Sequence, residues 1–447
     1  MGNFLKEKIT GVEYDVWKKI LGKETLDNMI ENWDDPGEED EAVSESLARF
    51  CENPGRTYKA AWLEEQCFFP FYEPLLAFWI TMMEECNGWG LVRFSENVRE
   101  SLLKVLFSRL EGVSIRVLIR EMKALKDANK LSGSDTHKEY EYYVNHYLTQ
   151  GEYRGEILKK YKALTWILYC QMKNFQNFIR EFETHLKDDR DEIADVFFEG
   201  NAPGQIAELK LGASDAHFGG RTVVRVTWSD GQVLYYKPRS MRNDLMYQEI
   251  YTWLAGECHM ESYTYKILDK GRHGWCEAVL PGDCTNEDQV KRYFYRLGLQ
   301  LFICYLFSVK DMHFENILAC GEHPVLVDLE TFPGRAFSGN DMSMTGQAFT
   351  RLADSVLMTG ALPITVWNFD GQGVRLGAIG RQEKQKLPVR VPVIIRGKTS
   401  EMDVILTHPE FEVKGNLPAL DGKAVDPSKY VNELVEGFLS AYRFARE

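Results

Sequence analysis

The chain has 447 residues, of which 44% are hydrophobic and 27% charged, a composition typical of a globular protein with two or three domains. Its formal net charge of −14 disfavours nucleic acid or an anionic membrane as a partner, and a cationic or neutral peptide fits better. The nine scattered cysteines form no C-x-x-C pair, which disfavours a disulfide framework or zinc site and predicts a reducing, cytoplasmic location. No stretch predicts a membrane span or a signal peptide.

Residues 1–195 predict a mostly α-helical region. Apolar residues recur with the helical period after Ser95, a candidate N-cap, and again from Tyr161 to Phe182. The acidic run 34–41 is most simply a solvated loop, and its alternative role is to receive a basic peptide. Nothing in this region indicates catalysis, so its aromatic residues are interpreted as core.

Residues 196–281 change to the pattern of β-strands, with one helix among them. The predicted elements are strands over 206–210, 222–228 and 232–237, a helix over 244–258, and strands over 263–268 and 275–280. The turn Ser229-Asp-Gly231 favours a hairpin between the second and third strands. The glycine-containing loop 212–220 could let backbone N–H groups approach phosphates, although it matches no known phosphate-binding fingerprint.

Lys237 ends the third strand, beside this loop, where nucleotide kinases keep a lysine that pairs with phosphates. The alternative is an exposed edge-strand lysine that opposes aggregation. On the following helix, the spacing predicts that Glu249 faces inward, where an ion pair with Lys237 would hold the lysine in place.

Residues 282–447 contain the pattern that most strongly indicates chemistry. After a hinge predicted at Pro281-Gly282, an apolar helix leads into the polar loop Asp311–Asn316, and a hairpin then ends at Asp328. Two acids and an amide that converge at a strand end suit a divalent cation and a hydroxyl nucleophile, as phosphoryl transfer requires. The alternative is a capped turn in which these side chains only satisfy local backbone groups.

The loop D-x-H-x-x-N followed by V-D-L is closer to phosphoinositide lipid kinases than to protein kinases, whose loop runs H-R-D. Five blocks occur in order: Ser214–Arg221, Tyr236–Ser240, Asp311–Asn316, Val327–Thr331 and Ser355–Pro363. Over roughly residues 200–445 the chain therefore resembles the dehydratase part of class II lanthipeptide synthetases, the LanM type.

This resemblance implies an α+β, bilobal kinase-like fold with an N-terminal α-helical domain. The expected domains are 1–195, a kinase-like N-lobe over 196–281 and a C-lobe over 282–447. Enzymes of this family bind a ribosomal precursor peptide through its leader and use ATP and Mg²⁺ to phosphorylate Ser and Thr. They then eliminate phosphate to give dehydroalanine and dehydrobutyrine.

The family's phosphorylation residues map onto this chain by motif. Lys237 would pair with the phosphates of ATP, with Arg239 and Glu249 in the same nucleotide site. Asp311 would orient or deprotonate the peptide hydroxyl. His313 would position groups or stabilise phosphate charge, because Asp311 occupies the position of the catalytic base.

The metal and elimination residues map in the same way. Asn316 and Asp328 would hold Mg²⁺, and Glu330 would support the metal site. Asp215 and His217 correspond to the family's elimination residues, and a histidine there could remove the α-proton or protonate the leaving phosphate.

The chain departs from the family after its final predicted helix, where the Arg/Thr elimination segment and the Cys-Cys-His zinc pattern of the cyclase are not found. We therefore expect no cyclisation by this chain alone and leave elimination open. A kinase-only member, a split enzyme completed by a second cyclase or elimination chain, and a truncated product all fit. The alternatives are a full dehydratase, a catalytically silent peptide-binding pseudokinase, and a lipid or small-molecule kinase.

Overall fold

A computed structural model describes residues 38–447 apart from 87–93, 213–217, 335–342, 368–372, 376, 380–383, 388 and 413–415. The chain forms two compact units. The helical unit comprises Met1–Asp188, Ala216–Arg221 and Ile394–Val404, and the mixed unit comprises Asp189–Asp215, Thr222–Val393 and Ile405–Glu447. The combination of long helices with an antiparallel sheet confirms the predicted α+β class.

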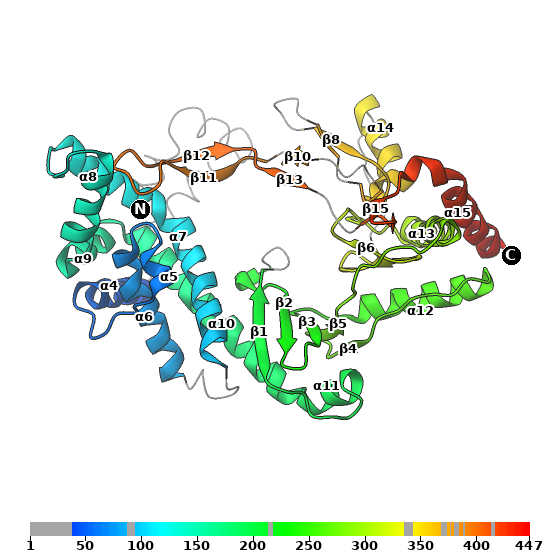
Figure 1. Cartoon of the computed structure of the whole chain (residues 1–447), viewed down its shortest axis with the longest axis horizontal. Helices are drawn as coiled ribbons and strands as arrows, with labels where there is room; N and C mark the ends of the chain where they lie inside the picture. Colours follow the sequence, from blue (N-terminus) through cyan, green and yellow to red (C-terminus); the bar gives the residue numbers. More distant parts are fainter. Residues whose placement is uncertain are drawn as a thin grey trace. The chain divides into compact units, whose positions relative to one another are not determined.

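The helical unit is built from packed helices (Figure 1). They are α4 (Glu38–Glu52), α5 (Ala61–Glu64), α6 (Phe69–Glu85), α7 (Glu96–Asp127), α8 (Thr136–Tyr142), the π-helix η1 (Tyr143–Leu148), α9 (Gly151–Lys160) and α10 (Lys162–Asp188). The N-cap predicted at Ser95 is confirmed, because its Oγ accepts a hydrogen bond from the amide of Val98. The helical period predicted from Tyr161 is confirmed by α10.

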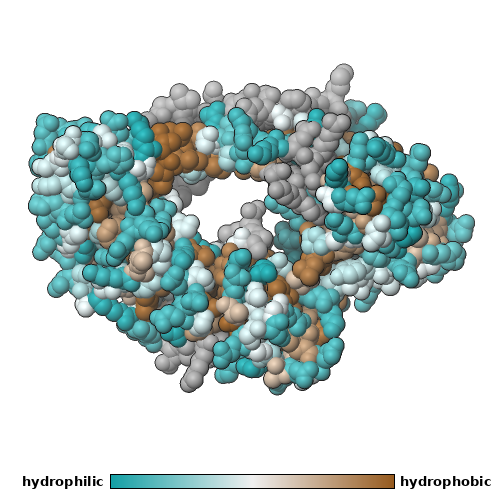
Figure 2. All heavy atoms as spheres, in the orientation of Figure 1, coloured by the Kyte–Doolittle hydropathy of each residue, from teal (hydrophilic) through white to brown (hydrophobic). Residues whose placement is uncertain are grey.

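Aromatic side chains fill the core of this unit, as the sequence predicted. Trp79 and Tyr72 of α6 are fully buried, and the Trp79 ring packs 5.3 Å from that of Phe175 on α10. In Figure 2 the face of α4, α6 and α8 turned to the viewer is mainly hydrophilic. Burial of apolar surface between the helices therefore stabilises the unit.

A short segment distant in sequence, Phe218–Arg221, also belongs to the helical unit. The guanidinium of Arg221 pairs with Glu181 on α10 at 2.8 Å, and Arg109 on α7 donates to the carbonyl oxygen of Gly220 at 3.0 Å. These contacts place η2 (Phe218–Gly220) against α10. The helical unit is therefore made of separate stretches of the chain and not of one continuous segment.

The mixed unit begins with α11 (Arg190–Phe197) and a five-stranded antiparallel sheet of order β1-β2-β3-β5-β4. Its strands are β1 (Ile206–Leu211), β2 (Val224–Trp228), β3 (Val233–Lys237), β4 (Ile267–Asp269) and β5 (Gly274–Glu277). The predicted hairpin is confirmed: β2 pairs with β3, and Gly231 has the positive φ of 88° that its turn requires. Strands β4 and β5 are shorter than predicted.

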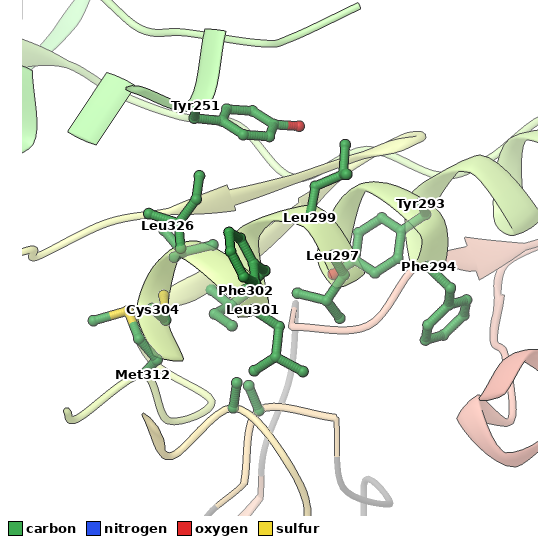
Figure 3. Close-up of a cluster of buried hydrophobic side chains, with 14 of the residues drawn as sticks. Tyr251, Tyr293, Phe294, Leu297, Leu299, Leu301, Phe302, Cys304, Met312 and Leu326 are labelled. Carbon is green, nitrogen blue, oxygen red and sulfur yellow. The ribbon is translucent and has the colours of Figure 1, made fainter. Parts of the chain in front are cut away.

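Three helices of the mixed unit surround its main hydrophobic core: α12 (Arg242–Glu257), α13 (Glu287–Leu306) and α15 (Val431–Arg446). Asn286 caps α13 by accepting a hydrogen bond from the amide of Gln289. Figure 3 shows side chains of α13 clustered with Tyr251 of α12, Leu326 and Met312. Met312 is fully buried, so the core anchors the loop that contains Asp311.

Short elements complete the mixed unit. They are β6 (Ile317–Cys320), β7 (His323–Leu326), α14 (Met344–Ala353), η3 (Val356–Thr359), β8 (Thr365–Trp367), β9 (Gly373–Arg375), β10 (Lys384–Lys386), β13 (Glu410–Glu412), β14 (Ala419–Leu420), β15 (Lys423–Ala424) and η4 (Pro427–Tyr430). The pair β11 (Val391–Ile395) and β12 (Asp403–Thr407) crosses the boundary of the units. No helix in the described ranges is long and apolar enough to cross a membrane.

Candidate functional site

Asn316 and Asp328 lie at the same end of the two-stranded sheet formed by β6 and β7. Ile317 pairs with Leu326 in the antiparallel register, and the amide of Val327 donates to the carbonyl oxygen of Asn316 at 2.9 Å. Asn316 comes just before β6, and Asp328 comes just after β7. Because the two strands are antiparallel, both residues lie at the open end of the hairpin. The backbone pairing thus places Asn316 near Asp328, and the predicted convergence of two acids and an amide on a metal stays a prediction.

Lys237 extends from the last position of β3 to this hairpin end. Its Nζ lies 3.2 Å from Oδ1 of Asp328 and 3.9 Å from Oδ1 of Asp244, and the residue is only 7% exposed. The alternative of an exposed edge-strand lysine is therefore wrong. A buried ammonium group requires a carboxylate partner, and two lie beside it.

Arg239 joins the same cluster and links its two acids. Its Nη1 donates to Asp244 at 2.7 Å, and its Nη2 donates to Asp328 at 2.8 Å. The fixed directions of the guanidinium N–H groups allow one side chain to serve both carboxylates. The cluster thus contains two cations, Lys237 and Arg239, and two anions.

The carboxylate beside Lys237 on α12 is that of Asp244, and the predicted pairing with Glu249 is wrong. Asp244 lies in the first turn of α12 and is fully buried, as are Tyr247 and Tyr251 at the following helical spacings. Glu249 follows Asp244 by five residues, which at 3.6 residues per turn places it well away from this face, and it is exposed. The sequence analysis did not identify Asp244. Its position in the first turn of a helix, five residues after Arg239, was a signal that it could pair with a nearby cation.

The charges around Asp328 keep it ionised. Burial alone would raise the pKa of this carboxyl, but the positive charges and hydrogen bonds of Lys237 and Arg239 outweigh it and hold the pKa below its ordinary value. Burial likewise opposes the charge of Arg239, and Asp244 and Asp328 raise its pKa above the usual value. Both groups are therefore charged at neutral pH.

Asp311 lies on the loop between α13 and β6 with a backbone φ of 68°, in the left-handed region. Its carbonyl oxygen accepts a hydrogen bond from Nδ2 of Asn316 at 2.8 Å, and its side chain is 56% exposed. Asp328 also has a positive φ, of 58°. Such conformations are uncommon for residues other than glycine, and they concentrate at functional sites.

His313 lies beside Asp311 in a defined orientation. The amide of Glu315 donates to Nδ1 of His313 at 3.2 Å, so Nδ1 is the acceptor and the neutral ring carries its proton on Nε2. That Nε2 lies 3.4 Å from Oδ1 of Asp311. The imidazole of His313 therefore lies beside the Asp311 carboxylate.

Glu330 is exposed, two residues beyond Asp328. Asp215 and His217 lie outside the described residues. In the described part of the chain, the predicted residues form two groups. Lys237, Arg239 and Asp328 meet around Asp244, and Asp311 contacts His313 and Asn316. The backbone hydrogen bond between Val327 and Asn316 links the two groups.

The oxygen donors of the site fit Mg²⁺. Asn316 uses its amide nitrogen to hold Asp311, which leaves its amide oxygen as the atom that can bind a cation. Asp328 supplies an ionised carboxylate. Magnesium prefers such oxygen ligands and takes only one or two carboxylates when phosphates and water complete its shell. Among the described residues, no group of three or more His, Cys, Asp or Glu is arranged to hold a metal ion.

Residues 161–447 match the family described as Domain of unknown function (DUF4135). The chain belongs to this family. The DUF4135 match includes all the site residues described above, from Lys237 to Glu330.

The chain is also similar to the Lacticin 481/lactococcin biosynthesis protein LcnDR2 of Lactococcus lactis subsp. lactis, with 23% identity over 371 residues. The matched region covers 79% of this DUF4135 protein and 39% of LcnDR2, so the chain spans well under half of that relative's length.

Proposed function

We propose that this protein transfers the γ-phosphoryl group of ATP to Ser and Thr hydroxyls of a ribosomally made precursor peptide during lanthipeptide modification. The observation that carries the proposal is the meeting of Lys237 from the sheet with Asp328 from the hairpin, where Asn316 also lies. This is the combination that kinases use to hold phosphates and metal. The similarity to LcnDR2, a lacticin biosynthesis protein, supports a peptide as the substrate.

On this proposal the sheet with α11 and α12 forms the N-lobe and the remainder of the mixed unit the C-lobe of a kinase-like fold. Lys237 and Arg239 bind the phosphates of ATP from the sheet side. Asp328 and the Asn316 amide oxygen hold Mg²⁺, which when bound neutralises charge on the phosphates. Glu330 lies close enough in sequence to support that metal site.

Asp311 is the group that receives the proton of the peptide hydroxyl. The hydroxyl oxygen forms a bond to the γ-phosphorus as the bond from that phosphorus to the β–γ bridging oxygen breaks, and ADP leaves. The hydroxyl proton passes to the Asp311 carboxylate, which releases it to solvent. His313, whose Nε2 lies 3.4 Å from Oδ1 of Asp311, positions the same carboxylate towards the substrate.

The alternative is a full dehydratase that also eliminates the phosphate, with Asp215 and His217 or a second chain supplying the elimination groups. The similarity to a lacticin 481 biosynthesis protein is equally compatible with this alternative. A catalytically silent peptide-binding protein is the alternative of another class. The presence of Lys237, Asp311 and Asn316 together opposes it.

The test is intact mass spectrometry of the cognate precursor peptide after incubation with this protein, ATP and Mg²⁺. Gains of about 80 Da per modified residue would show phosphorylation, and losses of about 18 Da would show that dehydration is completed. Asp311→Asn should abolish both changes. An unmodified peptide, together with no rise in melting temperature on addition of Mg-ATP, would favour the silent binder.

Lys210→Met provides a matched control for Lys237→Met, because Lys210 lies on the same sheet but its side chain is 64% exposed. The Lys237 variant should lose both phosphate transfer and the Mg-ATP-dependent rise in melting temperature. The Lys210 variant should keep both. Equal activity of the two variants would contradict the assignment of Lys237.

A further inference from the structure

The peptide group that joins Asp311 to Met312 is held at both of its polar atoms. Its carbonyl oxygen accepts from Nδ2 of Asn316 at 2.8 Å, and its N–H donates to the carbonyl oxygen of Thr359 at 2.8 Å. Because the peptide group is planar, restraint of both atoms fixes its rotation and with it the backbone ψ of Asp311.

Asp311 needs such a restraint. Its φ of 68° is a conformation that an isolated aspartate disfavours, and its side chain is more than half exposed. Packing of the carboxylate therefore cannot set its direction. The buried side chain of Met312 anchors the next residue, and the two hydrogen bonds orient the peptide between them.

Thr359 presents its carbonyl from a rigid turn. The residue is 3% exposed, and its Oγ1 donates to the carbonyl oxygen of Val356 at 2.7 Å and accepts from the amide of Ala361 at 3.3 Å. The hydroxyl therefore closes the end of η3 and fixes the direction of the Thr359 carbonyl.

Gly360 allows this turn to approach the loop. Its φ is 82°, and a Cβ at this position would lie 3.1 Å from the amide nitrogen and 3.3 Å from the carbonyl carbon of Met312. The Gly360 carbonyl accepts from the amide of Ala378 at 3.2 Å, and His313 forms a bridge with neighbouring Gly377. Gly377 and Ala378 thus contact both this turn and the loop that contains Asp311 and His313.

We propose that Thr359 and Gly360, here termed the loop clamp, are positioning residues that hold Asp311 in the backbone conformation required for proton acceptance. The proposal rests on the proposed function, because the role of Asp311 as the proton acceptor is part of it. The loop clamp touches neither substrate nor metal and acts only through the peptide group between Asp311 and Met312.

The first test compares Gly360→Ala with Gly271→Ala. Gly271 has nearly the same φ, 80°, but a Cβ there would meet no atom within 4 Å, so this control carries the backbone strain without the contact. We expect Gly360→Ala to lower kcat by on the order of 10- to 100-fold, with the KM for ATP within about twofold of wild type. Gly271→Ala should keep both values near wild type.

A second variant guards against a failure of Gly360→Ala to fold. Thr359→Val removes the hydroxyl that closes η3 and keeps the carbonyl, so it should lower kcat by a smaller factor with the KM for ATP unchanged. A rise in KM without a fall in kcat in both clamp variants would overturn the proposal, because a positioning role for the proton acceptor requires the reverse.

Hydrogen exchange of a peptide fragment containing Met312 tests the clamp without any catalysis. The Met312 amide should exchange slowly in wild type and in Gly271→Ala, and faster in Gly360→Ala. Unchanged exchange, or equal kcat losses in Gly360→Ala and Gly271→Ala, would overturn the clamp. If wild type transfers no phosphate, the proposed function fails, and the exchange rates still decide whether Thr359 and Gly360 restrain the loop.

Discussion

Arg239 lies closer to Asp328 than Lys237 does: its Nη2 is 2.8 Å from Oδ1 of Asp328, and Nζ of Lys237 is 3.2 Å from the same oxygen. The other arm of the guanidinium contacts Asp244, which is fully buried at the start of α12. Arg239 therefore joins the sheet, α12 and the hairpin end through one side chain. A lysine, with a single charged atom, could not serve both acids with the same geometry.

Replacement of Arg239 by Ala should lower the free energy of unfolding by about 3–5 kcal/mol, because it leaves Asp244 buried with Lys237 3.9 Å away as its cationic neighbour. The Mg-ATP-dependent rise in melting temperature should also disappear. Urea unfolding and thermal shift check both expectations. Arg225→Ala, which removes a more exposed pair with Glu208 in the same sheet, should cost at most about 1 kcal/mol. Equal losses in the two variants would contradict a structural role of Arg239.

Local patterns made much of the candidate site predictable. Asp311 and Asn316 lie on one loop, and the hairpin that follows fixes Asp328 at the same end as Asn316 through short-range pairing. Lys237 was recognisable because it ends a strand after a clear hairpin turn. Each of these features depends on residues close together in sequence, where period and turn chemistry determine structure.

Contacts between distant segments were not predictable in the same way. The acid that faces Lys237 depends on how α12 is rotated about its axis, and the packing of Tyr247, Tyr251 and Leu254 in the core sets that rotation. The hydrogen bond from Met312 to Thr359 joins two irregular segments. The spacing of apolar residues in the sequence does not predict such a contact, which is seen only in the folded structure.

Glu322, in the turn of the β6–β7 hairpin, should make stability depend on acid pH. Hydrogen bonds and charges from Arg292 and Arg296 lower its pKa from 4.5 to about 2. A lowered folded-state pKa gives stability that is present above pH 4.5 and lost as pH falls towards about 2. Urea unfolding at pH 5 and pH 3 should show a smaller loss for Glu322→Gln than for wild type. Glu436→Gln, on the exposed side of α15, should keep the wild-type dependence.

Helices α13 and α15 cross at two glycines, Gly298 and Gly437. A Cβ on Gly437 would overlap the carbonyl oxygen of Tyr295, and one on Gly298 would overlap that of Leu434. Gly437→Ala should therefore lower the free energy of unfolding by about 1–3 kcal/mol, because the helices must separate. Gly112→Ala, at an exposed position of α7 where a Cβ meets nothing within 4 Å, should raise it by about 0.5–1 kcal/mol. Stabilisation by both substitutions would show that the close crossing is not required.

Glu183 on α10 should make the helical unit less stable as pH rises. It is fully buried, and within the described residues neither carboxyl oxygen has a hydrogen-bond partner, so burial raises its pKa from 4.5 to about 8. The folded state then binds a proton that the unfolded state releases, and stability should fall by about 4 kcal/mol between pH 4.5 and 8. Glu183→Gln, which resembles the protonated acid, should match wild type near pH 4.5 and exceed its stability at pH 8. Asp188→Asn, at the exposed last residue of α10, should follow the wild-type profile in urea unfolding. Parallel profiles for wild type and Glu183→Gln would mean that the buried carboxyl is ionised and compensated after all.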